Sequence, residues 1–375
     1  MKLIKANLLL GSAMLFVNGC ANAQHVREMP LKDAFKDKFY IGVALNRNQA
    51  QSKDDAEYQI IKSQFNSISP ENDMKWENIH PLKDTYNFGP ADDYVNTGKD
   101  LNMFIIGHTL LWHSQTPKWV FEDDNGNPLT RDALLKRLRD HIYTVMGRYK
   151  GTVKGWDVVN EALNEDGTLR DSKWRKIIGD DYIEKAFEYA HDADPDAELY
   201  YNDYNLYKKE KRKGAVDILK RLKAKNIPVK AVGEQGHYSL TGPSITEVEN
   251  AILDFIDAGV QINITELDIS VLPDKGAAAT ADVANNATYS KELDPYKNGL
   301  PAEVEQRLAA RYKSFFKLFI KFKENIDRIT FWGLSDGDTW LNNWPIRGRN
   351  NYPLLYNRDM SVKTKVKVEI LETAN

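Results

Sequence analysis

Two glutamates in this sequence stand at the ends of short apolar runs, where a buried strand would give way to polar residues. The run over 153–159 leads into Asn160 and Glu161, and the run over 261–266 ends on Glu266, with Asp268 two positions later. Two carboxylates carried into one site from distant parts of the chain can divide an acid role and a base role between them. For either glutamate alone, a solvated position at the start of a loop is the simpler interpretation.

The elements that would have to position these glutamates alternate along the chain. Short apolar runs are separated by longer amphipathic stretches, which is typical of βα units and a parallel sheet. The predicted strands cover 39–45, 66–69, 103–107, 153–159, 199–202, 229–233, 261–266 and 328–332, and the predicted helices cover 54–64, 131–147, 182–193, 209–225, 246–258 and 303–324. Residues 362–371 fit a strand by alternation and a helix by four-residue spacing, and we expect the helix.

The number of these units indicates the fold class. Eight βα units favour an α/β fold, a single (β/α)8 TIM barrel with its active site at the C-terminal ends of the strands. A doubly wound sheet is the structural alternative, but no glycine-rich phosphate turn follows the first strand. The irregular insertion over 272–300 directly follows the strand that carries Glu266, so we expect it to lie beside the site.

Polar and aromatic residues gather at the predicted C-terminal strand ends. In chain order they are Glu71, Asn72, Lys75, His108, Trp112, Gln115, Asn160, Glu161, Tyr204, Gln235, His237, Glu266, Trp332 and Trp340. Taken singly, the histidines and tryptophans are more often core residues, and the charged residues of the first group are more often solvated. Their recurrence at one strand end after another favours a shared site at the mouth of the barrel.

The segments around these residues resemble, one after another, the signature blocks of the family 10 glycoside hydrolases, the endo-β-1,4-xylanases. The resemblance extends from Gly42 to Leu355. It implies a (β/α)8 barrel and retaining hydrolysis of xylan and xylo-oligosaccharides without a cofactor. It also implies that Glu161, preceded by Asn160, is the general acid/base and that Glu266, in Thr-Glu-Leu-Asp, is the nucleophile.

The chemistry of retention makes the same demand. One carboxyl must be protonated and the other ionised, about 5–5.5 Å apart, so that one attacks the anomeric carbon while the other protonates the leaving oxygen. Mutual repulsion helps to keep the acid protonated. The predicted strands of Glu161 and Glu266 are not adjacent, so the two side chains would face each other across the barrel mouth.

The resemblance also implies roles for the surrounding residues. Positions corresponding to Glu71, Asn72 and Lys75 hold sugar hydroxyls on the non-reducing side of the bond. His108 would contact the sugar next to that bond, and His237 would hold Glu266. Core histidines bonded to backbone are the alternative for these two, and the alternative is the better one for a histidine considered alone.

Aromatic residues complete the implied site. Trp112, Trp332 and Trp340 would wall the sugar site and exclude a bulky hydroxymethyl group, and Tyr204 would be an aromatic platform on the leaving-group side. The remaining residues of the implied substrate-binding set are Gln115, Asn160 and Gln235. His108 and His113 are five positions apart, outside the usual helical zinc spacing, and no cysteine cluster accompanies them, so we expect no metal.

The composition limits the classes of function. The chain of 375 residues has 42% hydrophobic and 28% charged residues, which is ordinary for a globular protein. A net charge of −3 gives no basic footprint for nucleic acid. Two other functions stay open, a related barrel glycosidase acting on glucan or mannan and a surface glycan-binding protein without catalysis. Because no separate carbohydrate-binding module is evident, the cleft itself would have to grip the polymer.

The first residues are predicted to be an export signal over 1–23, with a catalytic barrel over 24–375. A charged start precedes an apolar stretch too short to span a membrane, and small residues follow. Cleavage before Cys20 would give a lipoprotein anchored to the outer membrane or cell surface, whereas cleavage after Ala23 would give a secreted or periplasmic protein. Cys20 is the single cysteine of the chain, and its position favours the lipid anchor. We expect a monomer.

Overall fold

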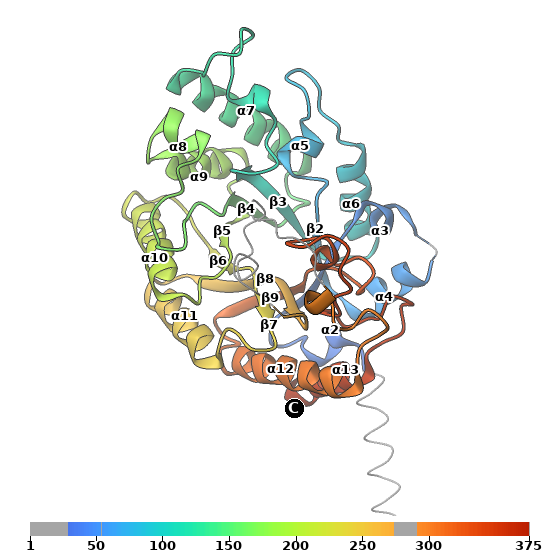
Figure 1. The fold of residues 1–375 in the computed structure, drawn as a ribbon. Helices are drawn as coiled ribbons and strands as arrows, with labels where there is room; N and C mark the ends of the chain where they lie inside the picture. Colours follow the sequence, from blue (N-terminus) through green and yellow to red (C-terminus); the bar gives the residue numbers. More distant parts are fainter. Residues whose placement is uncertain (1–28, 54, 274–290, 375) are drawn as a thin grey trace, which may run out of the picture.

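A computed structural model of the protein describes residues 29–53, 55–273 and 291–374 (Figure 1). The predicted export signal with Cys20 lies outside the described residues, as do positions 274–290 of the predicted insertion. None of the described helices is long and apolar enough to cross a membrane.

Eight parallel strands close into a barrel. Their order is β6-β5-β4-β3-β2-β1-β9-β8, and pairing of β6 with β8 completes the circle. The barrel strands are β1 (Tyr40–Leu45), β2 (Ser67–Pro70), β3 (Phe104–Trp112), β4 (Gly155–Asn160), β5 (Glu198–Asp203), β6 (Ala231–Glu234), β8 (Gln261–Ser270) and β9 (Ile326–Phe331). The predicted TIM barrel is confirmed, and the doubly wound alternative is wrong because the sheet has no open edge at β6.

Two strands run further than predicted, and both extensions carry site residues. β3 continues to Trp112 instead of ending at Gly107. β8 continues to Ser270, because the short strand β7 (His237–Ser239) pairs with its outer half, with His237 opposite Asp268. Glu266 therefore lies within a strand and is held on a rigid backbone, whereas the sequence predicted it at a strand end.

Helices surround the barrel, as the outer coils of Figure 1 show. They are α2 (Leu31–Ala34), α3 (Arg47–Gln51), α4 (Ala56–Gln64), α5 (Trp76–Ile79), α6 (Gly89–Asp100), α7 (Arg131–Tyr149), α8 (Lys173–Ile178), α9 (Tyr182–Ala193), α10 (Lys209–Ala224), α11 (Ile245–Asp257), α12 (Ala302–Lys321) and α13 (Thr364–Leu371). The predicted helices are confirmed to within a few residues, including the C-terminal one. Helix α6 was not predicted, since it opens on Gly89 and Pro90 and is largely polar.

The helices begin and pack as their sequences dictate. In α11 the Ser244 side chain accepts from the Glu247 backbone N–H and the Glu247 side chain accepts from the Ser244 N–H, a capping box that satisfies two donors at the helix start. The buried residues of α11 recur at helical spacing, as Val248, Ile252 and Phe255 illustrate. This face packs against the barrel, so the solvent face can stay polar.

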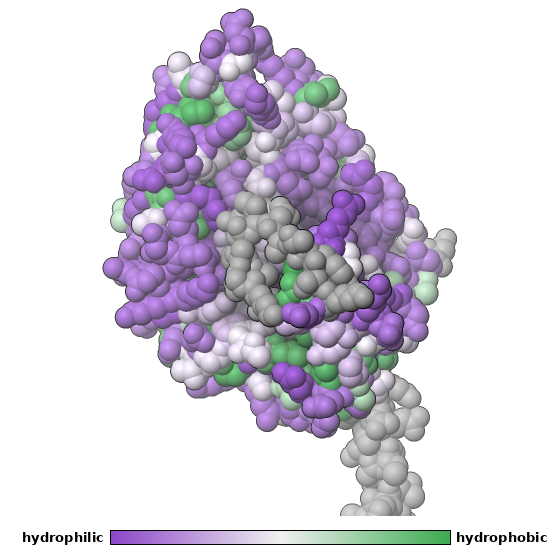
Figure 2. Space-filling model, viewed as in Figure 1, coloured by the Kyte–Doolittle hydropathy of each residue, from purple (hydrophilic) through white to green (hydrophobic). Residues whose placement is uncertain are grey.

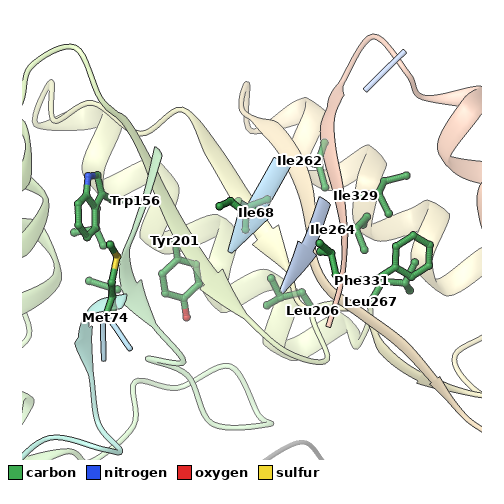
Figure 3. Packing of buried hydrophobic residues seen from close by; sticks show 14 of the residues in the cluster. Ile68, Met74, Trp156, Tyr201, Leu206, Ile262, Ile264, Leu267, Ile329 and Phe331 are labelled. Atoms are coloured by element: carbon green, nitrogen blue, oxygen red, sulfur yellow. The ribbon is translucent and has the colours of Figure 1, made fainter. Parts of the chain in front are cut away.

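The main hydrophobic core lies between strands and helices. It includes Ile41, Ile68, Ile264, Ile329 and Phe331, all at most 1% exposed. Figure 3 shows several members of this core on their strands. The outer surface in the matching view is mostly hydrophilic, with small separate hydrophobic areas (Figure 2).

Polar side chains fill part of the barrel interior. The Arg328 guanidinium is 2% exposed, and its Nη1 donates to Thr330 Oγ1 at 2.8 Å. Thr265 and Asn202 are also buried, and Thr265 Oγ1 donates to Asn202 Oδ1 at 2.7 Å. Buried polar groups need partners, so these bonds fix the side chains inside the barrel.

Candidate active site

A cavity of about 260 Å³ lies at the C-terminal mouth of the barrel. The residues that line it are Glu71, Asn72, Lys75, His108, Trp112, Gln115, Asn160, Glu161, Gln235, His237, Glu266, Trp332 and Trp340. The structure thus brings together every site residue predicted from the sequence except Tyr204. They come from strands throughout the barrel, and closure of the barrel makes them neighbours.

Glu161 follows β4 directly and has a backbone φ of 57°, in the left-handed region. Such a conformation costs a non-glycine residue free energy and is retained where the surroundings hold it. Three neutral donors meet the carboxylate. Trp112 Nε1 donates to Oε2 at 2.9 Å, and Gln235 Nε2 and Asn160 Nδ2 donate to Oε1 at 3.0 and 3.3 Å. Glu161 is therefore held in one orientation at the wall of the cavity.

The surroundings of Glu161 favour its protonated form. Burial raises the pKa of this carboxyl, and the negative charge of Glu266 raises it further. Hydrogen bonds from Gln235 and Trp112 lower the pKa but do not cancel the effect of burial. Glu161 is consequently suited to holding a proton that it can give to a leaving group.

Glu266 meets a different set of neighbours. Asn202 Nδ2 donates to its Oε1 at 2.8 Å, and His237 Nε2 lies 3.3 Å from its Oε2. The other imidazole nitrogen of His237 lies 3.1 Å from Asp268 Oδ1. Asp268 is fixed in turn, because Trp340 Nε1 donates to its Oδ2 at 2.8 Å.

These neighbours reverse the effect of burial on Glu266. Burial alone would raise the pKa of Glu266, but the hydrogen bond from His237, the charges of His108 and His237, and the Asn202 bond together lower it. Burial also lowers the pKa of His237, yet the carboxylates of Asp268 and Glu266 outweigh it and raise that pKa to about 10. The imidazole of His237 is then cationic at neutral pH, which favours an ionised Glu266.

A chain of amides joins the two glutamates. Asn202 Nδ2 donates to Asn160 Oδ1 at 2.9 Å as well as to Glu266, and Gln235 Nε2 lies 3.4 Å from the same Asn160 oxygen. Asn202 was not among the predicted site residues, although it ends the fifth predicted strand. Its close approach requires Gly233, because a Cβ there would lie 2.2 Å from Asn202 Oδ1. The network fixes both carboxylates relative to each other.

The cavity is also lined by a buried lysine, Lys75. Lys75 is 7% exposed, and its Nζ donates to Asn72 Oδ1 at 3.0 Å and lies 5.0 Å from the centre of the Trp112 ring. Burial lowers the pKa of Lys75, while the carboxylates of Glu266 and Glu71 oppose that shift. Burial also raises the pKa of Glu71. Lysine and amide donors that face an open cavity are suited to holding hydroxyl groups.

His108 has a partner that the sequence did not indicate. Its Nδ1 lies 2.9 Å from Asp157 Oδ2, and both side chains are buried within the barrel. The His108 ring centre lies 5.5 Å from that of Trp332. Because His108 lines the cavity while its inner nitrogen meets Asp157, its other nitrogen is oriented toward the site.

Residues 30–370 match Glycosyl hydrolase family 10. The chain belongs to this family. It is 45% identical over 337 residues to endo-1,4-β-xylanase A of Xylanibacter ruminicola, covering 90% of this chain and 91% of that one. It is 41% identical over 339 residues to a β-1,4-xylanase of Dictyoglomus thermophilum, covering 90% and 89%. The family predicted from the strand-end residues is confirmed, and the chain is an enzyme of the retaining glycoside hydrolase class.

Solved structures of family 10 proteins superpose on the whole barrel. A family 10 endoxylanase from a sugarcane soil metagenome has a TM-score of 0.87 at 43% identity, covering 91% of this chain and 99% of that one. Another solved structure, of a mutant in complex with xylotriose, has a TM-score of 0.81 at 36% identity, with coverages of 91% and 99%. The barrel of this family 10 chain is therefore the fold of its relatives.

Tyr204 departs from the prediction for this family 10 chain. The residue is 1% exposed and does not line the cavity. Lys211 Nζ covers its ring at 3.3 Å from the ring centre, and Arg170 Nη2 donates to its hydroxyl at 3.0 Å. The expected open platform for a sugar is therefore not present at Tyr204 in this structure, because a buried lysine occupies the ring face.

Lys211 belongs to a buried charged cluster behind the acid/base side. It is 0% exposed, and its Nζ lies 3.0 Å from Asp203 Oδ1. Asp203 Oδ2 also accepts from the Tyr201 hydroxyl at 2.6 Å. Within the described residues, no group of three or more histidine, cysteine, aspartate or glutamate side chains is arranged to hold a metal ion. What the site presents is two carboxyls whose pKa values are shifted in opposite directions, in a cavity lined by aromatic and polar side chains.

Proposed function

We propose that this protein is an endo-1,4-β-xylanase in which Glu161 is the general acid/base and Glu266 is the nucleophile. One observation carries the assignment. The two glutamates line the same cavity, yet the pKa of Glu161 is raised and that of Glu266 is lowered. A retaining glycosidase needs this division between a protonated and an ionised carboxyl.

The first step forms a glycosyl-enzyme. A Glu266 oxygen attacks the anomeric carbon, the bond from that carbon to the glycosidic oxygen breaks, and Glu161 transfers its proton to the departing oxygen. Asn202 and His237 hold the attacking carboxylate by its two oxygens. This fixed geometry removes much of the entropic cost of bringing nucleophile and substrate together.

The second step releases the sugar with its original anomeric configuration. Esterification removes the negative charge of Glu266, so the pKa of Glu161 falls and the carboxylate becomes a base. It takes a proton from water, the water oxygen attacks the anomeric carbon, and the bond to Glu266 breaks. Gln235 and Trp112 can stabilise the ionised Glu161 through the hydrogen bonds that they donate to it.

The walls of the cavity support xylan as the substrate. Trp112, Trp332 and Trp340 line the cavity, and the resemblance to family 10 implies that such a wall admits a pentose ring and excludes the hydroxymethyl group of a hexose. Lys75 and Asn72 offer donors to sugar hydroxyls on one side. The two relatives described above are both named as xylanases, and one solved structure of similar fold is a complex with xylotriose.

The decisive experiment follows products and stereochemistry. Purified protein is incubated with xylan, cellulose, mannan and short xylo-oligosaccharides, and NMR records the anomeric configuration of the first products. We expect internal cleavage of xylan and initial products of β configuration. Preferential cleavage of glucan or mannan would mean that xylan is not the substrate. Initial products of α configuration would contradict the roles of the glutamates.

We further propose that the protein is exported and that Cys20 carries a lipid anchor. The proposal depends on the charged start, the apolar stretch and the lone cysteine of the first residues. The native protein should partition with membranes, and Cys20→Ser should not acquire the lipid. A mature N-terminus at Gln24 in the native host would instead mean ordinary secretion.

A further inference from the structure

A second cavity lies at the other end of the barrel. Its volume is about 400 Å³, within the range of small-molecule sites. It is lined by residues at or near the starts of strands, among them Tyr40 of β1, Phe104 of β3 and Arg328 of β9. Tyr40 and Asn263 both pair in register with Arg328, so these three lie at one level of the barrel. This N-terminal cavity is separate from the active site, which is at the opposite mouth.

The floor of the N-terminal cavity holds buried polar atoms without partners. Asn263 is 1% exposed, and among the described residues neither its amide nitrogen nor its amide oxygen has a hydrogen-bond partner. Arg328 is 2% exposed and uses Nη1 for Thr330, while its Nη2 has no hydrogen-bond partner in the described chain. Both side chains line the cavity. Buried groups of this kind are almost always bonded, so they are poised for a ligand that donates and accepts.

An exposed aromatic ring stands at the same cavity. Tyr40 is 42% exposed at the start of β1. Its ring centre lies 4.8 Å from that of Phe104, at an interplanar angle of 35°. Phe104 therefore supports Tyr40 from one side, and the outer part of the ring stays available for the apolar face of a ligand.

The charges of the N-terminal cavity argue against an ionic ligand. Side chains of both signs line it, and Lys230 Nζ lies 3.9 Å from Asp327 Oδ2. The charged lining residues are Lys36, Lys38, Lys230 and Arg328 on the positive side and Asp37, Glu198 and Asp327 on the negative side. A phosphate would meet the carboxylates and a cation would meet the lysines. A neutral polyhydroxyl ligand can pair with both kinds of group.

Resting on the proposed function, we infer that the N-terminal cavity is a second binding site for a xylan segment. Tyr40 stacks on a xylose ring, while Asn263 and Arg328 bond its hydroxyls. The site contributes no catalysis. It holds the enzyme on the polymer, so that the active site meets xylan at a raised local concentration. The second site should therefore increase the rate of hydrolysis of insoluble xylan, whereas it should not change the rate for a short soluble substrate.

The test separates this site from the catalytic cleft. A 2-deoxy-2-fluoro-xylobioside with a dinitrophenolate leaving group should form a slowly hydrolysed ester with Glu266, which intact-protein mass spectrometry detects. Binding of xylohexaose to the trapped protein is then measured by calorimetry for the wild type, Tyr40→Ala, Asn263→Leu and the control Tyr143→Ala. Tyr143 is a matched control, because it is 41% exposed and lies on α7.

We expect Tyr40→Ala to weaken xylohexaose binding roughly ten-fold, about the loss of one aromatic contact, while Tyr143→Ala has no effect. Asn263→Leu should also weaken binding with no loss of melting temperature, since its amide has no partner in the described residues to lose. Tyr40→Ala should hydrolyse aryl xylobiosides normally and adsorb less to insoluble xylan. If all four trapped proteins bind xylohexaose equally, or if none of them binds it, the second site is overturned. The trapped ester, and with it the proposed function, would not be affected by that result. Absence of the trapped ester would overturn the proposed function itself.

Discussion

Glu161 and Glu266 occupy the same cavity at nearly the same depth, with 4% and 5% of each residue exposed. Burial pushes both pKa values upward, yet only that of Glu161 ends above its ordinary value. The difference lies in the donors. Glu161 receives hydrogen bonds from neutral indole and amide groups, whereas Glu266 contacts a histidine that Asp268 keeps cationic. The charge of the neighbour, more than the degree of burial, separates the acid from the nucleophile.

The largest effect should come from removing the nucleophile. Glu266→Gln keeps the shape and can still accept from Asn202, but it cannot form the glycosyl ester. We expect kcat on xylan to fall roughly 10⁴–10⁶-fold, the scale seen when a catalytic nucleophile is lost. Activity assays together with circular dichroism would check this. If the variant still hydrolyses xylan substantially, and deamidation of the new glutamine has been excluded, Glu266 is not the nucleophile.

Removal of the acid should have a smaller effect that depends on the leaving group. Glu161→Ala should slow xylan hydrolysis by about 10²–10⁴-fold, because a sugar alkoxide needs a proton to depart. An aryl xylobioside with an acidic phenol should still form the glycosyl-enzyme quickly, and azide should restore turnover as a β-glycosyl azide. If both substrates slow equally and azide rescues neither, Glu161 is not the acid/base.

The fold and the place of the site could be predicted from patterns in the sequence, whereas the division of roles between Glu161 and Glu266 was implied only by the resemblance to family 10. The eight strands, the position of Glu161 after Asn160 and the polar strand ends are local patterns, and the structure brings those residues to one cavity. The missed contributions are contacts between distant segments. Asn202 joins Glu266 across 64 positions, and Asp157 meets His108 across 49. No local spacing reports such pairs.

Tyr204 is a residue for which a contact with another segment made the prediction from sequence wrong. The resemblance to family 10 implied an open platform at Tyr204, but Lys211 of helix α10 covers the ring. Whether an aromatic side chain is exposed depends on what packs over it, and here that residue comes from the following helix. Likewise the extension of β8 past Glu266 depends on β7, which is too short to be predicted from its own sequence.

Replacement of His237, the charged neighbour of Glu266, should move the acid limb of the pH profile of kcat/KM. His237→Gln removes the cation and weakens the hold on Glu266, so the pKa of Glu266 should rise. Activity at low pH depends on ionised Glu266, and the acid limb of kcat/KM should therefore move to higher pH by roughly one to two units, the size of a charged hydrogen bond. The alkaline limb should move less. An acid limb that stays in place would mean that His237 does not control the ionisation of Glu266.

Replacement of Trp112, a neutral donor to Glu161, should give the smallest effect of these four substitutions. Trp112→Phe keeps an aromatic wall but removes the donor that Glu161 Oε2 accepts at 2.9 Å. That bond lowers the pKa of Glu161, so its loss should raise the pKa and extend activity to more alkaline pH. Because the indole carries no charge, and Gln235 and Asn160 still donate to the ionised Glu161 carboxylate, we expect a shift of only about half a unit. The measurement is the pH dependence of kcat/KM, which follows ionisation of the free enzyme, while any weaker grip on the sugar would change KM equally at all pH values. A shift as large as that of His237→Gln, or a shift toward acid, would show that neutral and charged donors do not differ here as argued.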